Sequence, residues 1–196
     1  MAADPTRVLV HADESCLGNG REPPNPGGNA ALIEVRAGDS VARWDVFECA
    51  PDTTNQRMAL AGAIVALEWV HRQWQRSEIR YVSDSEYLIK GMSTWVHDWE
   101  QRGWKRKGGA IENLELWRKL VQAARGHQIT WQWVRGHAGH PKNEYANFLA
   151  MRAAERQERS NGLVPSGFDA WLDRKGAAGA YPDYDPDAEL YEHPQG

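Results

Sequence analysis

The order in which strand-like and helix-like stretches follow one another constrains the fold of this chain most. Short apolar runs are typical of strands, and apolar residues spaced three and four apart are typical of amphipathic helices. On these patterns we expect strands at 6–12, 30–35, 42–49, 79–83 and 129–134, and helices at 55–74, 86–92, 112–124 and 141–159. This order predicts an α/β domain with a five-stranded mixed sheet flanked by helices, in which an antiparallel meander is extended by parallel strands.

The chain changes character near residue 160. All of these elements fall within 6–159, which is long enough for one domain with its own core. From Ser160 onward Gly, Pro and Asp become frequent. We expect Phe168–Leu172 to form one apolar helical turn docked on the body, and residues 176–196 to be disordered. The predicted organisation is therefore one domain over 6–159 and a largely irregular C-terminal tail over 160–196.

Most of the negative charge lies in this tail. The whole chain has a net charge of −4, and residues 161–196 contain seven acids and two bases. The rest of the chain is then close to +1. A nearly neutral body with local basic clusters is able to bind nucleic acid.

The cysteine content and the apolar runs bear on location. Cys16 and Cys49 are the only cysteines, so they form neither a disulfide framework nor a zinc-binding ladder, which fits a reducing compartment. The apolar run Val8–Val10 is too short for a signal peptide or a membrane span. We expect a cytoplasmic protein with no membrane association.

Two aspartates follow predicted strands. Asp13 and Asp84 each stand at the carboxyl end of a strand, and neighbouring strands would bring the two carboxylates to one edge of the sheet. Two acids a few ångströms apart repel each other, which favours a bound divalent cation. The alternative is that both are solvated turn residues.

A loop with two histidines follows the last predicted strand. His137 and His140 lie between this strand and a helix that begins near Pro141, and Glu144 and Asn147 stand about one turn apart on that helix. A histidine in a mobile loop beside a polar helix start is suited to proton transfer on a phosphodiester. Neither histidine has the partners of a zinc site.

Several segments resemble, in order, the motifs of type 1 ribonuclease H, and the resemblance spans residues 7–159. They are Ala12–Asn19, Thr53–Met58, Ser83–Ser85, Trp95–Lys105, Glu112–Trp117 and Val134–Glu144. The resemblance implies the ribonuclease H-like fold and metal-dependent endonucleolytic cleavage of the RNA strand of RNA–DNA hybrids. It implies two Mg²⁺ ions as cofactors, with Mn²⁺ as an alternative, and His137 as the catalytic proton carrier. We expect a monomer whose partner is the hybrid.

Two of the four family carboxylates are missing. Asp13 and Asp84 match the first and third, but the second falls on Ala59 and the fourth on Asn147. Asn147 still offers a neutral oxygen, so it stays a candidate ligand and catalytic residue beside Asp13 and Asp84. Because each ion loses a charged ligand, we expect lowered activity.

Glu14 is the candidate replacement. It stands where the family usually has glycine, directly after Asp13. Successive strand side chains point to opposite faces, so Glu14 should face away from Asp13 unless the strand bulges. Glu14 therefore enters the candidate metal ligands on this condition.

A tryptophan-rich basic segment is the predicted nucleic-acid contact. Basic groups engage phosphates and flat rings pack on sugars, which selects Trp95, Arg102, Trp104, Lys105, Arg106 and Lys107. The alternative for Trp95 and Trp99, spaced four apart, is helix core. Further family positions that grip the DNA strand match Asn19, Thr54, Asn55 and Gln56, for which helix capping is the alternative.

Two main functions remain open on the sequence, beside a third possibility, which is Mn²⁺-dependent cleavage of a different substrate. The first is an RNA–DNA hybrid ribonuclease; the second is a catalytically inactive protein that kept the fold and binds hybrid or duplex. Ala59 and Asn147 favour the second, whereas Asp13, Asp84 and the histidine loop favour the first. Designed substitution would also explain Ala59 and Asn147, but Glu14 and the longer loop at 20–26 favour natural divergence.

Overall fold

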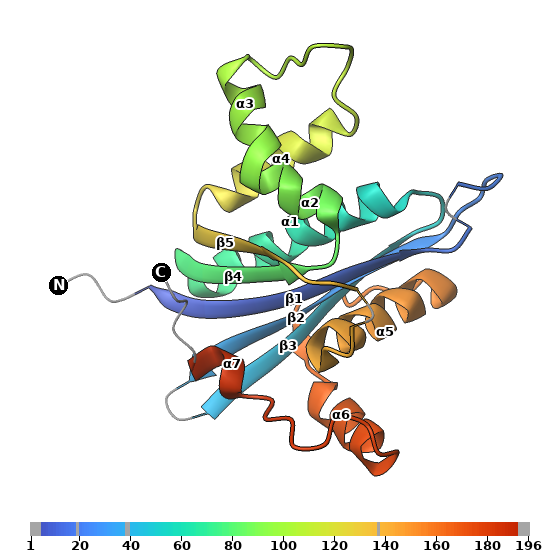
Figure 1. The fold of residues 1–196 in the computed structure, drawn as a ribbon, viewed down its shortest axis with the longest axis vertical. Helices are drawn as coiled ribbons and strands as arrows, with labels where there is room; N and C mark the ends of the chain where they lie inside the picture. Colours follow the sequence, from blue (N-terminus) through green and yellow to red (C-terminus); the bar gives the residue numbers. More distant parts are fainter. Residues whose placement is uncertain (1–4, 19, 38–39, 137, 192–196) are drawn as a thin grey trace.

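A mixed sheet with the strand order β5-β4-β1-β2-β3-β6 forms the centre of the computed structural model, which describes residues 5–18, 20–37, 40–136 and 138–191 (Figure 1). Strands β1 to β3 and β6 are antiparallel neighbours, and β1, β4 and β5 run parallel. The strands are β1 (Thr6–Cys16), β2 (Gly27–Ala37), β3 (Ser40–Ala50), β4 (Ser77–Ser83), β5 (Gln128–Trp133) and β6 (Val164–Pro165). The predicted fold class is confirmed, with one strand more than expected.

The extra strand, β6, has only two residues and pairs with Trp44 and Asp45 of β3. A pair of residues is too short to leave a periodic signal in the sequence. The predicted strands 6–12, 30–35 and 42–49 also extend further, because each continues into polar residues that still pair across the meander.

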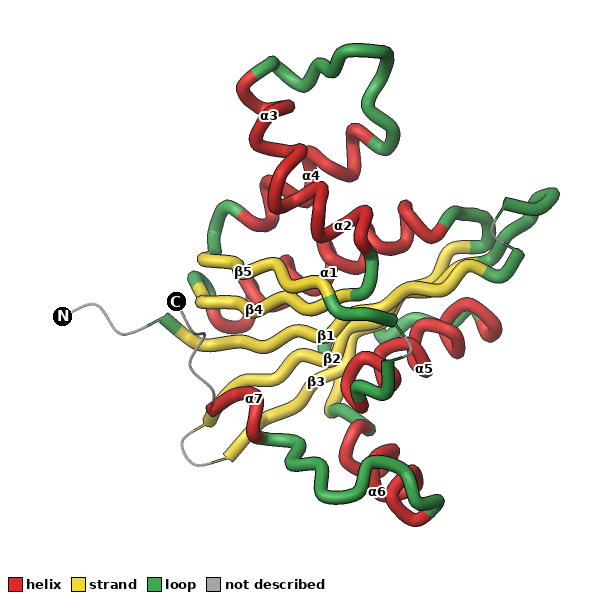
Figure 2. Tube along the Cα trace, in the orientation of Figure 1, coloured by secondary structure: helices red, strands yellow, loops and turns green. Residues whose placement is uncertain are grey.

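Helices cover both faces of the sheet (Figure 2). They are α1 (Asn55–Trp74), α2 (Glu86–Lys90), the π-helical turn η1 (Gly91–Trp95), α3 (Val96–Gln101), α4 (Leu114–Ala124), α5 (Pro141–Arg156), α6 (Phe168–Ala177) and α7 (Ala188–Tyr191). Within the described ranges, none of these helices has the length and apolarity needed to cross a membrane.

Alternation along the strands divides the core between the two faces. Val8, Val10 and Ala12 of β1 belong to the larger core, which α1 and α4 close. On the other face the smaller core is formed by β2, α5 and α6. Helix α5 comes very close to the sheet at Gly28, where an added Cβ would lie 2.3 Å from the carbonyl oxygen of Ala150.

The C-terminal segment is the main difference from expectation. Phe168 and Trp171 are buried against α5, as predicted for the apolar turn, but the turn belongs to a ten-residue helix. Beyond residue 176, where disorder was expected, the chain runs back along the sheet to α7 (Figure 1). The Tyr181 ring stacks on Trp171, and Asp187 forms an ion pair with Arg43. The expectation of disorder was wrong for 176–191; residues 192–196 lie outside the described residues.

Composition misled here because a few contacts with buried groups order the segment. Lys142 and Glu34 form an ion pair of 2.8 Å with fully buried side chains, and Lys142 also faces Glu189 of α7 at 3.4 Å. Buried charges need partners, and the segment supplies them.

We predict that truncation after Gly176 lowers the free energy of unfolding by about 3 kcal/mol, the lower end for removing one partner of a buried ion pair. Urea denaturation of the full and truncated chains measures the difference. Truncation after Tyr191 is the control, and it should leave the stability unchanged. Equal stability of all three proteins would show that the segment is dispensable for the fold.

Candidate active site

Three carboxylates meet at the end of the parallel part of the sheet. Asp13 and Glu14 belong to β1, and Asp84 directly follows β4. One oxygen from each carboxylate lies within 4.8 Å of the others. The parallel pairing of β1 with β4 ends at Ala12 and Ser83, so the next residues of both strands come together. This is the convergence that the sequence predicts for Asp13 and Asp84.

Glu14 joins the cluster without a bulge. Asp13 pairs with Ala30, which is packed on the α5 side, and Glu14 pairs with Asn29, which lies against Gly62 of α1. The two acids therefore do point to opposite faces. Asp84 lies beyond Ser83, the last paired residue of β4, where the sheet no longer separates its two faces. The side chains of Asp13 and Glu14 can therefore both approach Asp84. The expectation that Glu14 faces away from Asp13 is therefore confirmed, but this orientation does not keep its carboxylate out of the cluster, and no bulge is needed.

The other two family positions differ in their surroundings. Ala59 belongs to α1 and is buried in the larger core, and its methyl group offers no ligand atom. Asn147 is half-buried on α5, which packs on the sheet face that carries Asp13. The amide remains a candidate fourth ligand.

The cluster is electrostatically unfavourable without a cation. Burial, with added repulsion from Asp84 and Glu14, raises the pKa of Asp13 to about 8. Burial and the charge of Asp84 likewise raise the pKa of Glu14 to about 8. A divalent ion would remove this repulsion and favour the ionised acids.

The loop after β5 is shaped around Asp84. An added Cβ at Gly136 would lie 2.2 Å from Asp84 Oδ2, so any other residue there would have to displace the Asp84 carboxylate. The indole Nε1 of Trp133 donates a hydrogen bond of 3.0 Å to the carbonyl of Asp84. His137, the predicted proton carrier, lies outside the described residues.

The predicted basic contacts are exposed. Arg102, Lys105, Arg106 and Lys107 lie in and around the loop between α3 and α4, at the end of the molecule farthest from α6 (Figure 1). This arrangement leaves all four side chains free to reach phosphates.

The tryptophans beneath that loop are packed. Trp95 and Trp104 are half-buried, and Trp99 lies between them with ring centroids 6.0 and 6.4 Å away. Trp99 in turn packs edge-on against the buried Trp117. This favours the helix-core alternative for Trp95 and Trp99, and makes the rings a support for the basic loop.

The predicted contacts at the start of α1 are exposed. Thr54 is the N-cap, accepting a 3.3 Å hydrogen bond from the Arg57 amide, so capping is confirmed for this residue. Asn55 and Gln56 follow in the first turn. Asn19 lies outside the described residues.

A buried polar group beside the site was missed. His11, Glu34 and Lys142 are fully buried. The signal was present, because His11 and Glu34 interrupt otherwise apolar strands, and polar residues in such runs need partners.

The sheet order, the flanking helices and the acids at the strand ends define a ribonuclease H-like domain. Comparison with known proteins agrees, since the family model for RNase H matches residues 5–155. The chain belongs to the ribonuclease H family. Ribonuclease H of Methylococcus capsulatus is 40% identical over 159 residues, covering 81% of this chain and 95% of that protein. Ribonuclease H of Citrobacter koseri is 41% identical over 149 residues, or 76% and 89%.

A solved structure is also similar over nearly the whole chain. LC9-RNase H1, "a type 1 RNase H with the type 2 active-site motif", is 48% identical with a TM-score of 0.86. The match covers 98% of this chain and 93% of LC9-RNase H1, so it includes the C-terminal segment.

We predict that Asp84→Asn stabilises the metal-free protein at pH 8. The pKa of Asp13 and of Glu14 is about 8 in the folded chain, against about 4 in an unfolded chain. The folded state then binds more protons between these values, so stability is highest at low pH and is lost as the pH rises from about 4 to about 8. Removing the Asp84 charge should raise the free energy of unfolding at pH 8 by on the order of 1 kcal/mol, the equivalent of one pKa unit.

Urea unfolding in EDTA at pH 5 and pH 8 measures this effect. The difference between the two proteins should be smaller at pH 5, where the acids are largely protonated. Added Mg²⁺ should reverse the order at pH 8 by stabilising the wild type more, because it binds only the native state. A wild type that is more stable than the variant at pH 8 in EDTA contradicts the prediction.

Proposed function

We propose that this chain is a Mg²⁺-dependent endonuclease that hydrolyses the RNA strand of RNA–DNA hybrids. The observation that carries the proposal is the meeting of Asp13, Glu14 and Asp84 within 4.8 Å. Membership of the ribonuclease H family supports the substrate class. Catalysis is assigned to Asp13, Glu14 and Asp84, with Asn147 as a neutral ligand.

The donor set fits hard divalent cations. Three carboxylates meet here, and we assign the Asn147 amide as a fourth ligand. Mg²⁺ prefers such oxygen ligands, and its charge would relieve the repulsion among the acids. When bound, such ions activate a water and stabilise the leaving oxygen of the phosphodiester. The neutral Asn147 leaves one negative charge fewer than four carboxylates would, so we expect a raised Mg²⁺ requirement, and Mn²⁺ as an effective substitute.

The chain's own residues divide the work. Asp13 is buried at the centre, where it holds its position through the hydrogen bond that its Oδ1 accepts from the Glu14 amide, at 2.7 Å. Gly136 lies with its own backbone close to Asp84. From the sequence, we assign proton transfer to the next residue, His137. The exposed bases near residues 102–107 hold the substrate backbone.

Glu14 also supports the enzyme over the inactive binding protein, the two functions that the sequence left open. A chain that had lost its metals would have no need of a third acid at this edge. Glu14 comes from the α1 side, where the missing family glutamate would also lie at Ala59. LC9-RNase H1, described as a type 1 enzyme with another active-site motif, supports the idea that an altered set of acids can belong to an enzyme.

We predict that a glutamate at position 59 can replace the glutamate at position 14. Glu14→Gly should lower the rate of Mg²⁺-dependent cleavage by about 100-fold or more, as for loss of a group that stabilises developing charge. Ala59→Glu added to Glu14→Gly recreates the family arrangement and should recover much of the loss. Ala59→Glu alone should not raise the rate, because it adds repulsion to a complete set.

Cleavage of a labelled RNA–DNA hybrid under saturating Mg²⁺ measures all four proteins. An unchanged rate for Glu14→Gly would remove Glu14 from the metal ligands. A wild type that binds the hybrid and leaves it intact with both Mg²⁺ and Mn²⁺ would favour the inactive binding protein.

We also predict that hybrid binding weakens with salt. Each phosphate contact made by Arg102, Lys105, Arg106 or Lys107 contributes roughly 0.9 to the log–log slope for a B-like duplex. Replacing these bases one at a time by Gln should reduce the slope stepwise, whereas Arg72→Gln on α1 serves as a control away from the loop. The binding constant is measured in EDTA, so that cleavage does not interfere; an unchanged slope after all four replacements contradicts this surface.

A further inference from the structure

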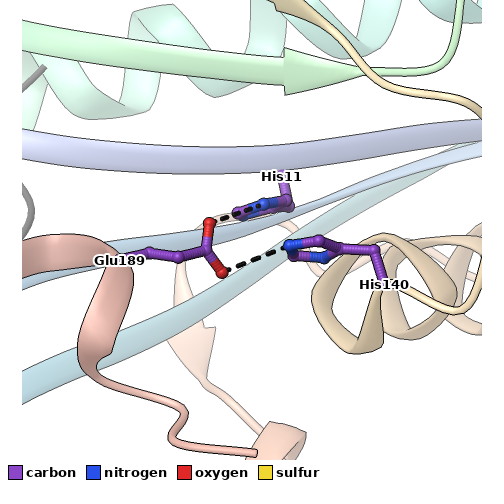
Figure 3. A group of neighbouring side chains, drawn as sticks. All are labelled: His11, His140 and Glu189. Atoms are coloured by element: carbon purple, nitrogen blue, oxygen red, sulfur yellow. Dashed lines mark ion pairs between the residues drawn. The ribbon is translucent and has the colours of Figure 1, made fainter. Parts of the chain in front are cut away.

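Helix α7 places one carboxylate between two histidines. Figure 3 shows Glu189 reaching both, with Oε2 at 3.5 Å from Nε2 of His11 and Oε1 at 3.3 Å from Nε2 of His140. The imidazole rings are stacked 4.9 Å apart. His11 is fully buried, so the polar edge of its ring has to be satisfied within the protein.

Two cations complete the surroundings of this carboxylate. Lys142 Nζ lies 3.4 Å from Oε1, and Arg80 Nη2 lies 3.5 Å from Oε2. The Tyr184 hydroxyl also donates to Oε1, at 3.2 Å. Burial acts to raise the pKa of Glu189, but the neighbouring imidazoles of His11 and His140 and the charge of Lys142 hold that pKa well below its usual range. The carboxylate is therefore ionised and surrounded by donors.

The spacing of His11, His140 and Glu189 would also suit a metal ion. Lys142 and Arg80 argue against this reading, because each already places a positive charge beside the same carboxylate. Both oxygens of Glu189 are engaged by donors, so a dication would have to displace them. The group is better described as a clamp than as a second metal site.

The partners of Glu189 belong to the elements that carry the candidate metal ligands. His11 lies on β1, on the same face as Asp13 two residues further on. Arg80 lies on β4, which leads to Asp84. His140 is the N-cap of α5 and Lys142 is in its first turn, on the helix that carries Asn147.

The same segment contacts α5 a second time. The Tyr181 hydroxyl donates a hydrogen bond of 2.5 Å to Glu144, which precedes Asn147 by three residues on α5. The C-terminal segment therefore contacts both the first residues of α5 and the turn that carries Asn147.

We propose that Glu189 is a positioning residue, which fixes β1, β4 and the start of α5 relative to one another and thereby sets the geometry of the metal centre. The inference rests on the ligand set of the proposed function. Loss of the Glu189 charge would leave Arg80 and the two histidines without this carboxylate, and Lys142 with Glu34 as its remaining acidic partner. Helix α5 would then shift away from β1, and Asn147 would move relative to Asp13.

Glu189→Gln in the full chain removes the charge and keeps the shape. We expect it to weaken Mn²⁺ binding, measured by electron paramagnetic resonance, by roughly 10-fold, as when an outer-shell partner of a metal ligand is lost. The Mg²⁺ concentration for half-maximal hybrid cleavage should rise in parallel. Asp169→Asn is the matched control: it also removes an acid of the C-terminal segment, which pairs with Arg43 at 3.1 Å and is 65% exposed. It should leave Mn²⁺ affinity unchanged.

A cycle with Asn147→Ala separates positioning from general destabilisation. If Glu189 acts through α5, its substitution should cost less in Mn²⁺ affinity once the Asn147 amide is gone, so the two effects are not additive. Additive effects, or an unchanged affinity in Glu189→Gln, overturn the proposal. Should Glu189→Gln fail to fold, Glu189→Asp keeps the charge and shortens the reach, with the same expectation at a smaller magnitude.

The Mn²⁺ measurement does not depend on cleavage. A wild type that binds Mn²⁺ but does not cleave hybrid contradicts the proposed function and still tests the clamp. A wild type that binds no Mn²⁺ at millimolar concentration overturns the clamp as well, since there would be no metal centre to position.

Discussion

Repulsion among three carboxylates at one edge of the sheet is the constraint on which the rest of the site depends. Asp13, Glu14 and Asp84 are held within 4.8 Å, and the pKa values of Asp13 and Glu14 are raised to about 8. A fold keeps such a group only if rigid elements hold it against the repulsion. Here the parallel pairing of β1 with β4 holds the strand ends that carry the acids, and the backbone at Gly136 lies close to the Asp84 carboxylate. The repulsion among the acids lowers the free energy of unfolding, and the two apolar cores, one on each face of the sheet, offset this loss.

The position of Glu14 shows what the end of a strand permits. Within a sheet, neighbouring residues on one strand cannot serve one site, because the sheet separates their side chains. At the end of β4 this separation ceases, and a carboxylate beyond the last pair is reached from both faces. An acid on β1 can therefore occupy space that an acid on α1 would otherwise fill, provided that the facing helix residue is small. Ala59 is small and buried in the core on the α1 side of the sheet, which is the side that Glu14 faces, so the proposed exchange of the acid between these two positions fits this condition.

Periodicity and strand ends predicted the fold class, most elements and the meeting of Asp13 with Asp84, because these depend on local patterns. The same reasoning failed where the outcome depends on contacts between distant segments. Face alternation correctly oriented Glu14 and still gave the wrong conclusion, since it says nothing about where Asp84 lies relative to the end of β4. Composition indicated disorder after residue 176. It could not show that acids of this segment pair with Arg43 and Lys142, which lie far away in the sequence. The polar interruptions at His11 and Glu34 were the one local sign of that need.

The acidic C-terminal segment acquires a different meaning once its partners are known. A run of acids in a Gly- and Pro-rich tail is usually a solvated appendage, and near a nucleic-acid surface it would repel the substrate. In this chain Asp187 pairs with Arg43, and Glu189 lies beside Lys142 and Arg80, so part of the tail's negative charge is offset by these bases of the domain. The exposed bases at 102–107 lie at the other end of the molecule, away from α6 and α7 (Figure 1). The net charge of −4 therefore understates the positive potential around the exposed bases, because the acids of the C-terminal segment lie away from them.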